Sequence, residues 1–115
     1  MPWNVEAADE YVLWWNGLSE AEQISVDAYI RLVEHYGPAL TRPYSDTVKN
    51  SKHKNMKELR VQHQGKPYRI LYAFDPKRTA ILLIGGNKTG KKRWYDTFIS
   101  IADQLFDEHL KDCKE

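Results

Sequence analysis

The sequence predicts an α+β fold: an N-terminal helical hairpin packed on a small antiparallel sheet of three to four strands, followed by a C-terminal helix. Three observations predict it. Helical spacing occupies the first third of the chain, alternating segments joined by short turns fill the middle, and helical spacing returns at the end. With 115 residues, 42% of them hydrophobic, we expect one domain spanning residues 1–115.

A short strand is predicted at residues 2–7, because alternation places Trp3 and Val5 on one side. A first helix is expected over residues 9–15, and Gly17 allows the chain to turn after it. Because so few residues connect this helix to the next, we expect the two to form an antiparallel hairpin.

Ser19 and Glu22 have the spacing of a capping box, which predicts the start of a second helix ending near Tyr36. Apolar residues recur every fourth position along it, flanked by two further apolar residues; they are Ile24, Ala28, Leu32 and Tyr36, with Tyr29 and Val33 beside them. This spacing predicts that they form its buried face.

The remaining segments follow in a simple order. Residues 39–55 lack periodicity and are predicted to be a loop. Three strands are predicted at 56–62, 68–74 and 79–84, with turns between them and with Tyr68, Tyr72 and Phe74 in the core. A C-terminal helix is predicted from Trp94 to about His109.

Charge is segregated along the chain. Residues 49–93 contain 13 Lys or Arg and only two acidic residues, a net charge of +11, whereas the rest of the chain carries −10. This favours a surface that binds a polyanion such as RNA or DNA. No stretch is apolar enough to span a membrane and the N-terminus does not resemble a signal peptide, so we expect a cytoplasmic protein.

The single cysteine, Cys113, has no partner for a disulfide and no companion with metal-ligand spacing. We therefore expect no cofactor and no metal site, and a frayed end at this residue. A P-loop-like pattern, G-x-x-x-x-G-K, begins at Gly85, but Lys92 stands where a P-loop has Ser or Thr, so nucleotide hydrolysis is rejected. These glycines could still receive an RNA phosphate before the helix.

Several short motifs together point to a family. They are Leu59-Arg60, Tyr68-Arg69, the apolar strand 80–84 and the Gly-x-x-Lys pattern 85–88, followed by a helix. In this combination the sequence resembles the RelE/ParE superfamily of type II toxins, and within it the HigB branch. The resemblance implies a metal-independent mRNA endoribonuclease that acts at the ribosome and is inhibited by a cognate antitoxin, a helix-turn-helix DNA-binding protein. Two alternatives stay open: a ParE-like gyrase inhibitor and a non-catalytic nucleic-acid-binding module.

The resemblance implicates Arg69, Lys88 and Tyr95 as catalytic residues. RNA cleavage without metal requires a base for the 2′-hydroxyl, cations for the charge on phosphorus and an acid for the departing oxygen. Arg69 and Lys88 could stabilise the phosphoryl charge, while Tyr95 could orient, protonate or stack. Crowding by neighbouring cations could also let Lys88 act as base. Further RNA contacts are expected from Arg60, Lys57, Lys91, Lys92 and Arg93.

Glu58 departs from the family pattern, since an acid occupies a strand where lysines are expected. It could be a general base or a salt-bridge partner for Arg60. The structural interpretation of Arg60 and Arg69 is likewise that they pair with carboxylates across strands. His53 and His63 lie in the basic segment, but without a visible partner neither is expected to shuttle protons.

Overall fold

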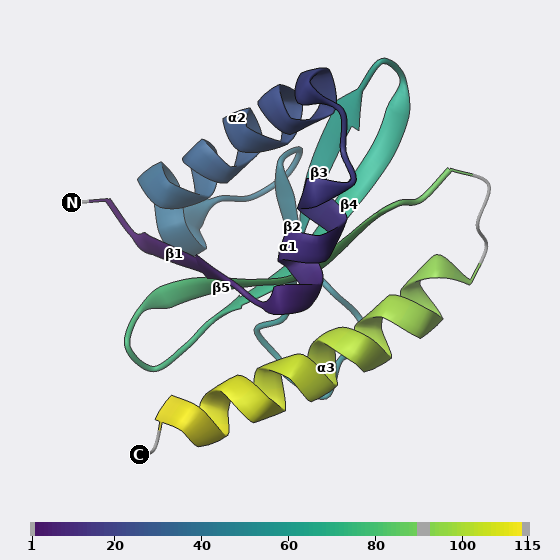
Figure 1. Cartoon of the computed structure of the whole chain (residues 1–115). Helices are drawn as coiled ribbons and strands as arrows, with labels where there is room; N and C mark the ends of the chain where they lie inside the picture. The colour runs from purple at the N-terminus through teal and green to yellow at the C-terminus, as the bar shows by residue number, and fades with distance from the viewer. Residues whose placement is uncertain (1, 90–92, 114–115) are drawn as a thin grey trace.

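The computed structural model describes residues 2–89 and 93–113, and Figure 1 shows their arrangement. The elements in chain order are β1 (Asn4–Ala7), α1 (Asp9–Asn16), α2 (Glu20–Tyr36), a short 3-10 helix (Gly37–Ala39), β2 (Ser45–Thr47), β3 (Lys57–His63), β4 (Lys66–Phe74), β5 (Thr79–Asn87) and α3 (Trp94–Cys113). In the described part of the chain, no helix combines the length and the apolar character that crossing a membrane requires.

The five strands form one sheet in the order β1-β5-β4-β3-β2. Strands β3, β4 and β5 form the predicted antiparallel meander, and the short first strand is confirmed as β1. The predicted sheet was wrong in two respects: it has five strands, and β1 pairs with β5 in parallel. Strand β2 lies within the segment that was predicted to be a loop. Its three residues carry no alternating pattern, and they form a strand because they pair with β3.

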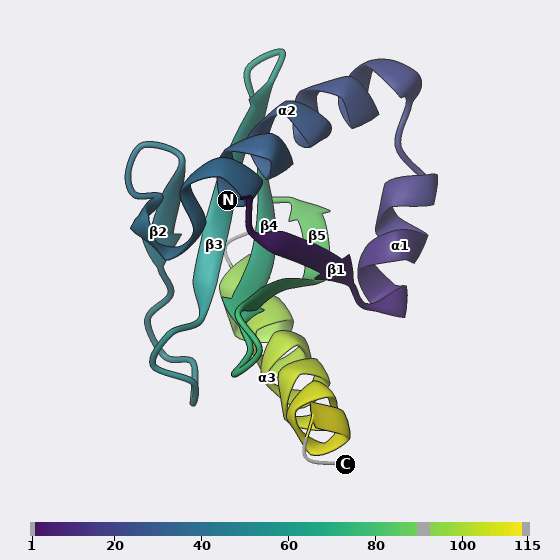
Figure 2. The same cartoon turned by 90° about the vertical axis from the view of Figure 1, so that its left-hand side faces the viewer.

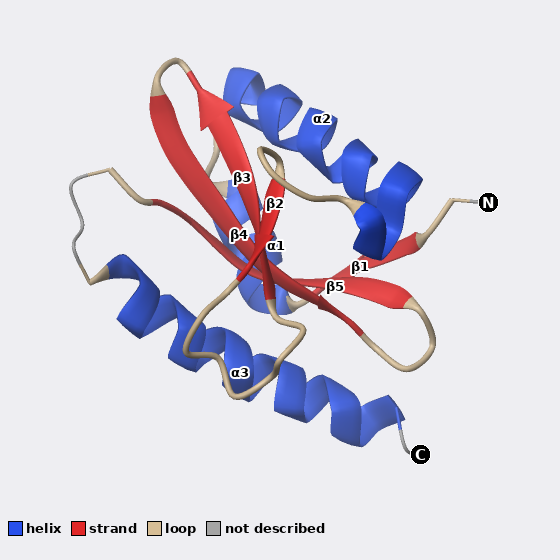
Figure 3. Cartoon of the chain, turned by 180° about the vertical axis from the view of Figure 1, so that it is seen from behind, coloured by secondary structure: helices blue, strands red, loops and turns tan. Residues whose placement is uncertain are grey.

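Helices cover both faces of the sheet, as Figures 1 and 2 show. The predicted helical hairpin is wrong, because α1 packs against β5 whereas α2 packs against β3. The two helices are neighbours in sequence but cover different strands of the same face, where one apolar core lies. Figure 3 shows α3 running across the opposite face, where it covers a second core. Helix α3 packs against β4 and β5 on this face.

Helix α2 begins as predicted but buries a different face. The Ser19 hydroxyl accepts from the Glu22 amide at 3.1 Å, and the Glu22 carboxylate accepts from the Ser19 amide at 2.8 Å, so the capping box is confirmed. Val26 and Val33 are fully buried, whereas Ile24 is 65% exposed. A spacing of seven residues returns to the same side after two turns, so the valines define the buried face better than the fourfold repeat did.

Two glycines of the P-loop-like pattern serve packing. Gly85 and Gly86 lie inside β5 and not in a loop before a helix, whereas Gly90 lies outside the described residues. A Cβ atom on Gly85 would lie 2.4 Å from the Trp14 ring, and one on Gly86 would lie 2.8 Å from Nε1 of Trp94. The absence of side chains therefore lets tryptophans approach both sides of β5.

Candidate active site

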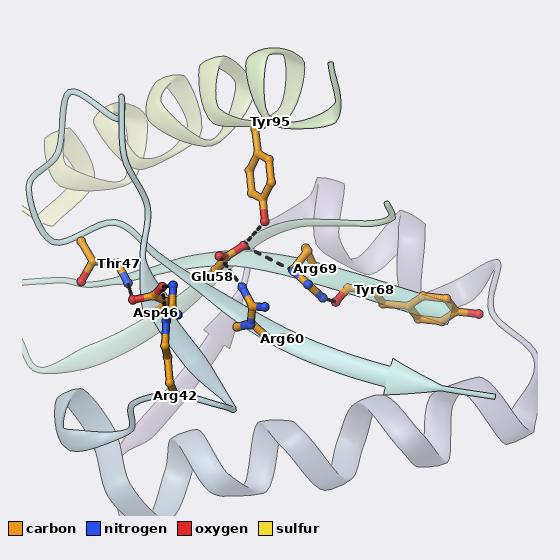
Figure 4. Close-up of polar contacts among 8 residues, drawn as sticks. All are labelled: Arg42, Asp46, Thr47, Glu58, Arg60, Tyr68, Arg69 and Tyr95. Carbon is orange, nitrogen blue, oxygen red and sulfur yellow. Dashed lines mark hydrogen bonds and ion pairs between the residues drawn. The ribbon is translucent and has the colours of Figure 1, made fainter. Parts of the chain in front are cut away.

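Two arginines face each other across the central strands. Arg60 on β3 and Arg69 on β4 are direct partners in the antiparallel ladder, a position where like charges repel. Glu58 lies two residues before Arg60 and therefore on the same face of the sheet. Its Oε2 is 3.2 Å from Nη1 of Arg60, and its Oε1 is 3.5 Å from Nε of Arg69 (Figure 4). The carboxylate thus compensates the repulsion between the two cations.

The centre of this cluster is buried. Glu58 is 6% exposed and Arg69 is 3% exposed. Nη1 of Arg69 donates a hydrogen bond to the Tyr68 carbonyl at 3.0 Å, while its Nε, near Glu58, has no hydrogen-bond partner. The Arg69–Glu58 contact therefore acts mainly through charge, which is strong where water is excluded. The predicted pairing of both arginines with a carboxylate is realised here by Glu58.

Tyr95 joins the cluster from the opposite layer. It is the second residue of α3, and Figure 4 shows its ring pointing from the helix toward the sheet. Its hydroxyl donates a hydrogen bond to Oε1 of Glu58. Burial raises the pKa of Tyr95, and the Glu58 carboxylate raises it further. The phenol therefore stays protonated near neutral pH and is a poorer acid than free tyrosine.

Lys88 lies on the other side of the Tyr95 ring. It directly follows β5, and its amide donates to the Pro67 carbonyl at 2.8 Å. Its ammonium nitrogen is 4.9 Å from the centroid of the Tyr95 ring, within cation–π distance. Burial lowers the pKa of Lys88, and Arg69 and Arg60 lower it further, while Glu58 opposes them.

Among the described residues, the cations that lower the pKa of Lys88 are Arg69 and Arg60. Lys91 and Lys92 lie outside the described residues. Arg93 is exposed in the turn before α3 and does not contribute to the lowered pKa. Partial burial and the two sheet arginines, which belong to different strands, produce the effect. The run of basic residues in the sequence does not reveal that arginines from two strands lie near Lys88.

A pocket of about 300 Å³ opens beside the cluster. Glu58, Arg60 and Tyr95 form one wall, and the other walls come from β2, the segment after it and the first turns of α3. Its lining residues are Arg42, Asp46, Thr47, Val48, Lys49, Asn50, Glu58, Arg60, Tyr95, Asp96 and Ile99. Basic and acidic side chains alternate around it, so it suits a ligand with both anionic and hydrogen-bonding groups, such as a nucleotide.

Sequence reasoning missed the pocket wall that β2 provides. Arg42 and Asp46 form an ion pair there, with Nη2 of Arg42 2.7 Å from Oδ2 of Asp46. The hydrogen bond from Arg42 lowers the pKa of Asp46, and the Thr47 amide lowers it further. Both residues lie in the segment without periodicity, and only the pairing of β2 with β3 brings them beside Arg60.

Lys57 does not join the cluster. Strand alternation places it on the face of Leu59 and Val61, opposite to Glu58. The expectation that Lys57 contacts RNA together with Arg60 therefore finds no support in the geometry.

The two histidines of the basic segment have partners elsewhere in the fold. Nε2 of His53 is 2.8 Å from Oδ1 of Asp107, and Nδ1 of His63 is 2.6 Å from the Ser25 hydroxyl. Lys52 also pairs with Asp107, so α3 neutralises part of the basic segment. Neither histidine lines the pocket beside Glu58.

Comparison with known proteins agrees with this architecture. The family model described as phage derived protein Gp49-like (DUF891) matches residues 13–107. HigB2 and HigB3 of Mycobacterium tuberculosis, which carry toxin names, are each 52% identical to this chain over 84% of its length. The match covers 84% of HigB3 but 49% of HigB2, so the chain spans about half the length of HigB2.

Solved structures show the same fold at low sequence identity. A free arginine-to-alanine double mutant of the Escherichia coli toxin RelE matches with a TM-score of 0.63 at 10% identity, covering 88% of this chain and 99% of that one. The Mycobacterium tuberculosis toxin–antitoxin complex RelBE2 contains a chain that matches with a TM-score of 0.56 at 13% identity, covering 76% and 99%. The chain therefore belongs to the Gp49-like family together with the HigB relatives, and it has the fold of RelE.

Proposed function

We propose that this chain is the toxin of a type II toxin–antitoxin system and that it cleaves mRNA without a metal ion at the pocket beside Glu58. The observation that carries the proposal is the meeting of Arg60, Tyr95 and Lys88 around one buried carboxylate. The relatives HigB2 and HigB3, which carry toxin names, support the toxin assignment.

Arg60 and Lys88 are the cations best placed to meet a phosphate. The Arg60 side chain is 32% exposed and lines the pocket, and its guanidinium can donate two hydrogen bonds to phosphate oxygens. Lys88 is partly exposed and does not itself line the pocket, but its ammonium lies over the ring of Tyr95, which does. Because its pKa is lowered, its neutral amine forms at lower pH than in an ordinary lysine, so we assign it the base that activates the 2′-hydroxyl.

Tyr95 is assigned to orientation and stacking. Its raised pKa makes it a weak proton donor, and its hydroxyl is already engaged by Glu58. The ring remains available to a base and to the Lys88 ammonium.

Arg69 and Glu58 are assigned as positioning residues. The Arg69 side chain is only 4% exposed, so it acts on the pocket through Glu58 and Tyr95. Both oxygens of Glu58 already have partners among Arg60, Arg69 and Tyr95, which favours an organising role over that of a general base.

The proposed partners follow from the same family. The RelBE2 structure contains a toxin together with its antitoxin. We infer that this chain binds a cognate antitoxin, a helix-turn-helix DNA-binding protein encoded beside it, and acts on mRNA at the ribosome in the cytoplasm.

Primer extension on mRNA after induced expression tests the activity. We expect new 5′ ends with the wild type, a loss of about 100-fold or more with Lys88→Ala, and little change with Lys111→Ala, an exposed lysine in the last turn of α3. Absence of new ends together with inhibited gyrase supercoiling would favour the ParE-like alternative. RNA binding without cleavage would favour the non-catalytic module.

The pH dependence of cleavage separates two roles of Lys88, that of a base and that of a fixed positive charge. Its lowered pKa predicts that cleavage rises with pH and levels off below 10.5, the ordinary lysine value. Lys88→Arg keeps a cation that does not lose its proton, so this variant should be slow and lose the rise. A Lys88→Arg enzyme with wild-type rate and pH profile would show that only the positive charge matters.

A further inference from the structure

Three side chains of different chemistry converge at the other end of α3. Asp75 lies at the turn between β4 and β5, and His109 and Cys113 lie on the last turns of the helix. Oδ2 of Asp75 is 2.8 Å from Nε2 of His109 and 3.6 Å from Sγ of Cys113, and the last two atoms are 3.3 Å apart. The prediction that Cys113 has no metal-ligand companion and lies on a frayed end is therefore wrong.

The carboxylate is held in place by the turn. Oδ1 of Asp75 accepts hydrogen bonds from the Lys77 and Thr79 amides, both at 2.9 Å, and the Asp75 side chain is 3% exposed. The backbone thus fixes one oxygen and leaves the other directed at the helix. Such a second set of hydrogen bonds commonly orients metal-binding carboxylates.

His109 and Cys113 are four residues apart, so they lie on the same side of α3. Both Asp75 and Cys113 approach the same ring nitrogen of His109. A Cys-His-Asp catalytic arrangement would use the two opposite ring nitrogens, one for the thiol and one for the carboxylate. The geometry therefore differs from that of an activated nucleophile and instead directs one N, one O and one S atom toward a common point.

We propose that Asp75, His109 and Cys113 bind a divalent transition-metal ion, with Zn²⁺ as the best fit. Zinc ligands at about 2.0–2.3 Å in tetrahedral directions lie roughly 3.4–3.6 Å apart. Two of the three separations are already 3.3 and 3.6 Å, and the Asp75–His109 pair needs to open by about half an ångström. A set with imidazole and thiolate favours zinc over magnesium or calcium.

The bound ion would connect the end of α3 to the β4–β5 turn. Of the three residues, His109 also lines a groove of about 270 Å³, whose wall carries Glu108 and Asp112. Because α3 carries Tyr95 at its other end, the ion would stabilise the helix that completes the pocket without taking part in the cleavage.

Titration of the full chain with Co²⁺ under reducing conditions tests the site, because cobalt bound to thiolate shows a sulfur-to-metal charge-transfer band. We expect one ion per chain, tetrahedral cobalt bands and their replacement by Zn²⁺. Cys113→Ser should remove the charge-transfer band and His109→Gln should abolish stoichiometric binding. His53→Gln is the matched control, since it alters another His–Asp pair between the sheet layer and α3 and should leave the spectrum unchanged.

A second readout is the thermal unfolding midpoint. Zn²⁺ should raise the Tm of the wild type and of His53→Gln but not that of Cys113→Ser, because only an ion that binds the folded state stabilises it. Circular dichroism should confirm that Cys113→Ser is folded. Lack of stoichiometric binding by the wild type, or a cobalt spectrum unaffected by both Cys113→Ser and His109→Gln, would overturn the proposal and leave three hydrogen-bonded side chains.

Discussion

Helix α3 meets a buried carboxylate of the sheet at each end, and the two carboxylates are built in opposite ways. Near its start, Glu58 has Arg60, Arg69 and the Tyr95 hydroxyl around its two oxygens. Near its end, Asp75 has one oxygen bound to backbone amides and the other directed at helix side chains.

The groups around each carboxylate determine the role that it can have. Glu58 is needed as the counter-charge of a buried guanidinium, so removing it leaves a charge without a partner in a medium that excludes water. Asp75 is anchored by neutral amides through one oxygen, and its second oxygen contacts His109 and Cys113. In our proposals the first arrangement organises a pocket for RNA, and the second binds a metal ion.

The largest expected effect is at Glu58. Glu58→Ala should lower the free energy of unfolding by about 3–5 kcal/mol, because Arg69 stays buried beside Arg60 without a counter-charge. Urea denaturation measures this loss. Asp46→Ala, which breaks the more exposed pair with Arg42, is the control and should cost about 1 kcal/mol or less. Equal, small losses in both variants would show that Glu58 does not compensate Arg69.

A smaller effect is expected at Tyr95. Tyr95→Phe removes the hydroxyl that donates to Glu58, and hydrogen bonds to charged groups contribute about 1.5–3 kcal/mol. Denaturant unfolding should show a loss in this range, and Glu58→Ala combined with Tyr95→Phe should be less than additive. Tyr44→Phe, at a tyrosine 44% exposed, should change stability by less than about 0.5 kcal/mol. Additivity within error would argue against the Tyr95–Glu58 contact.

The smallest expected effect concerns the response of Asp75 to acid. Burial alone would raise its pKa, but hydrogen bonds from His109, Thr79, Cys113 and Lys77 outweigh burial and hold the pKa below the ordinary 3.8. This contribution to stability is present above about pH 4 and is lost as the pH falls through the lowered pKa. Asp75→Asn should therefore narrow the difference in unfolding free energy between pH 7 and pH 3. If the pH 7 to pH 3 difference in unfolding free energy were the same in Asp75→Asn and in the wild type, the hydrogen bonds assigned to Asp75 would be contradicted.

Local patterns predicted most of the secondary structure. Alternation and turn residues placed the meander close to β3, β4 and β5, and the capping box placed the start of α2. Helical spacing placed α3 but ended it at His109, four residues early, because the final turn adds little apolar periodicity. These features depend on contacts between near neighbours in sequence, which is why the sequence predicts them.

The candidate site could be predicted only in part. The resemblance identified Arg60, Arg69, Lys88 and Tyr95, and the structure gathers these four around Glu58. The wall formed by Arg42 and Asp46 had no local signal. For the second cluster, the spacing of His109 and Cys113 on one helix face was a local signal. Their partner Asp75 lies more than thirty residues away in the sequence.

By itself, the sequence determined most of the elements, the polarised charge and the family. Tertiary structure alone decided that β1 pairs in parallel with β5, that α1 and α2 separate over the sheet and that α3 closes its other face. Tertiary structure also decided which groups surround Glu58 and Asp75. The alternating pattern of the strands did not show that the two carboxylates have different surroundings. The physical reason is that burial and charge compensation arise between residues distant in sequence, and both depend on which surfaces the packed layers bring together.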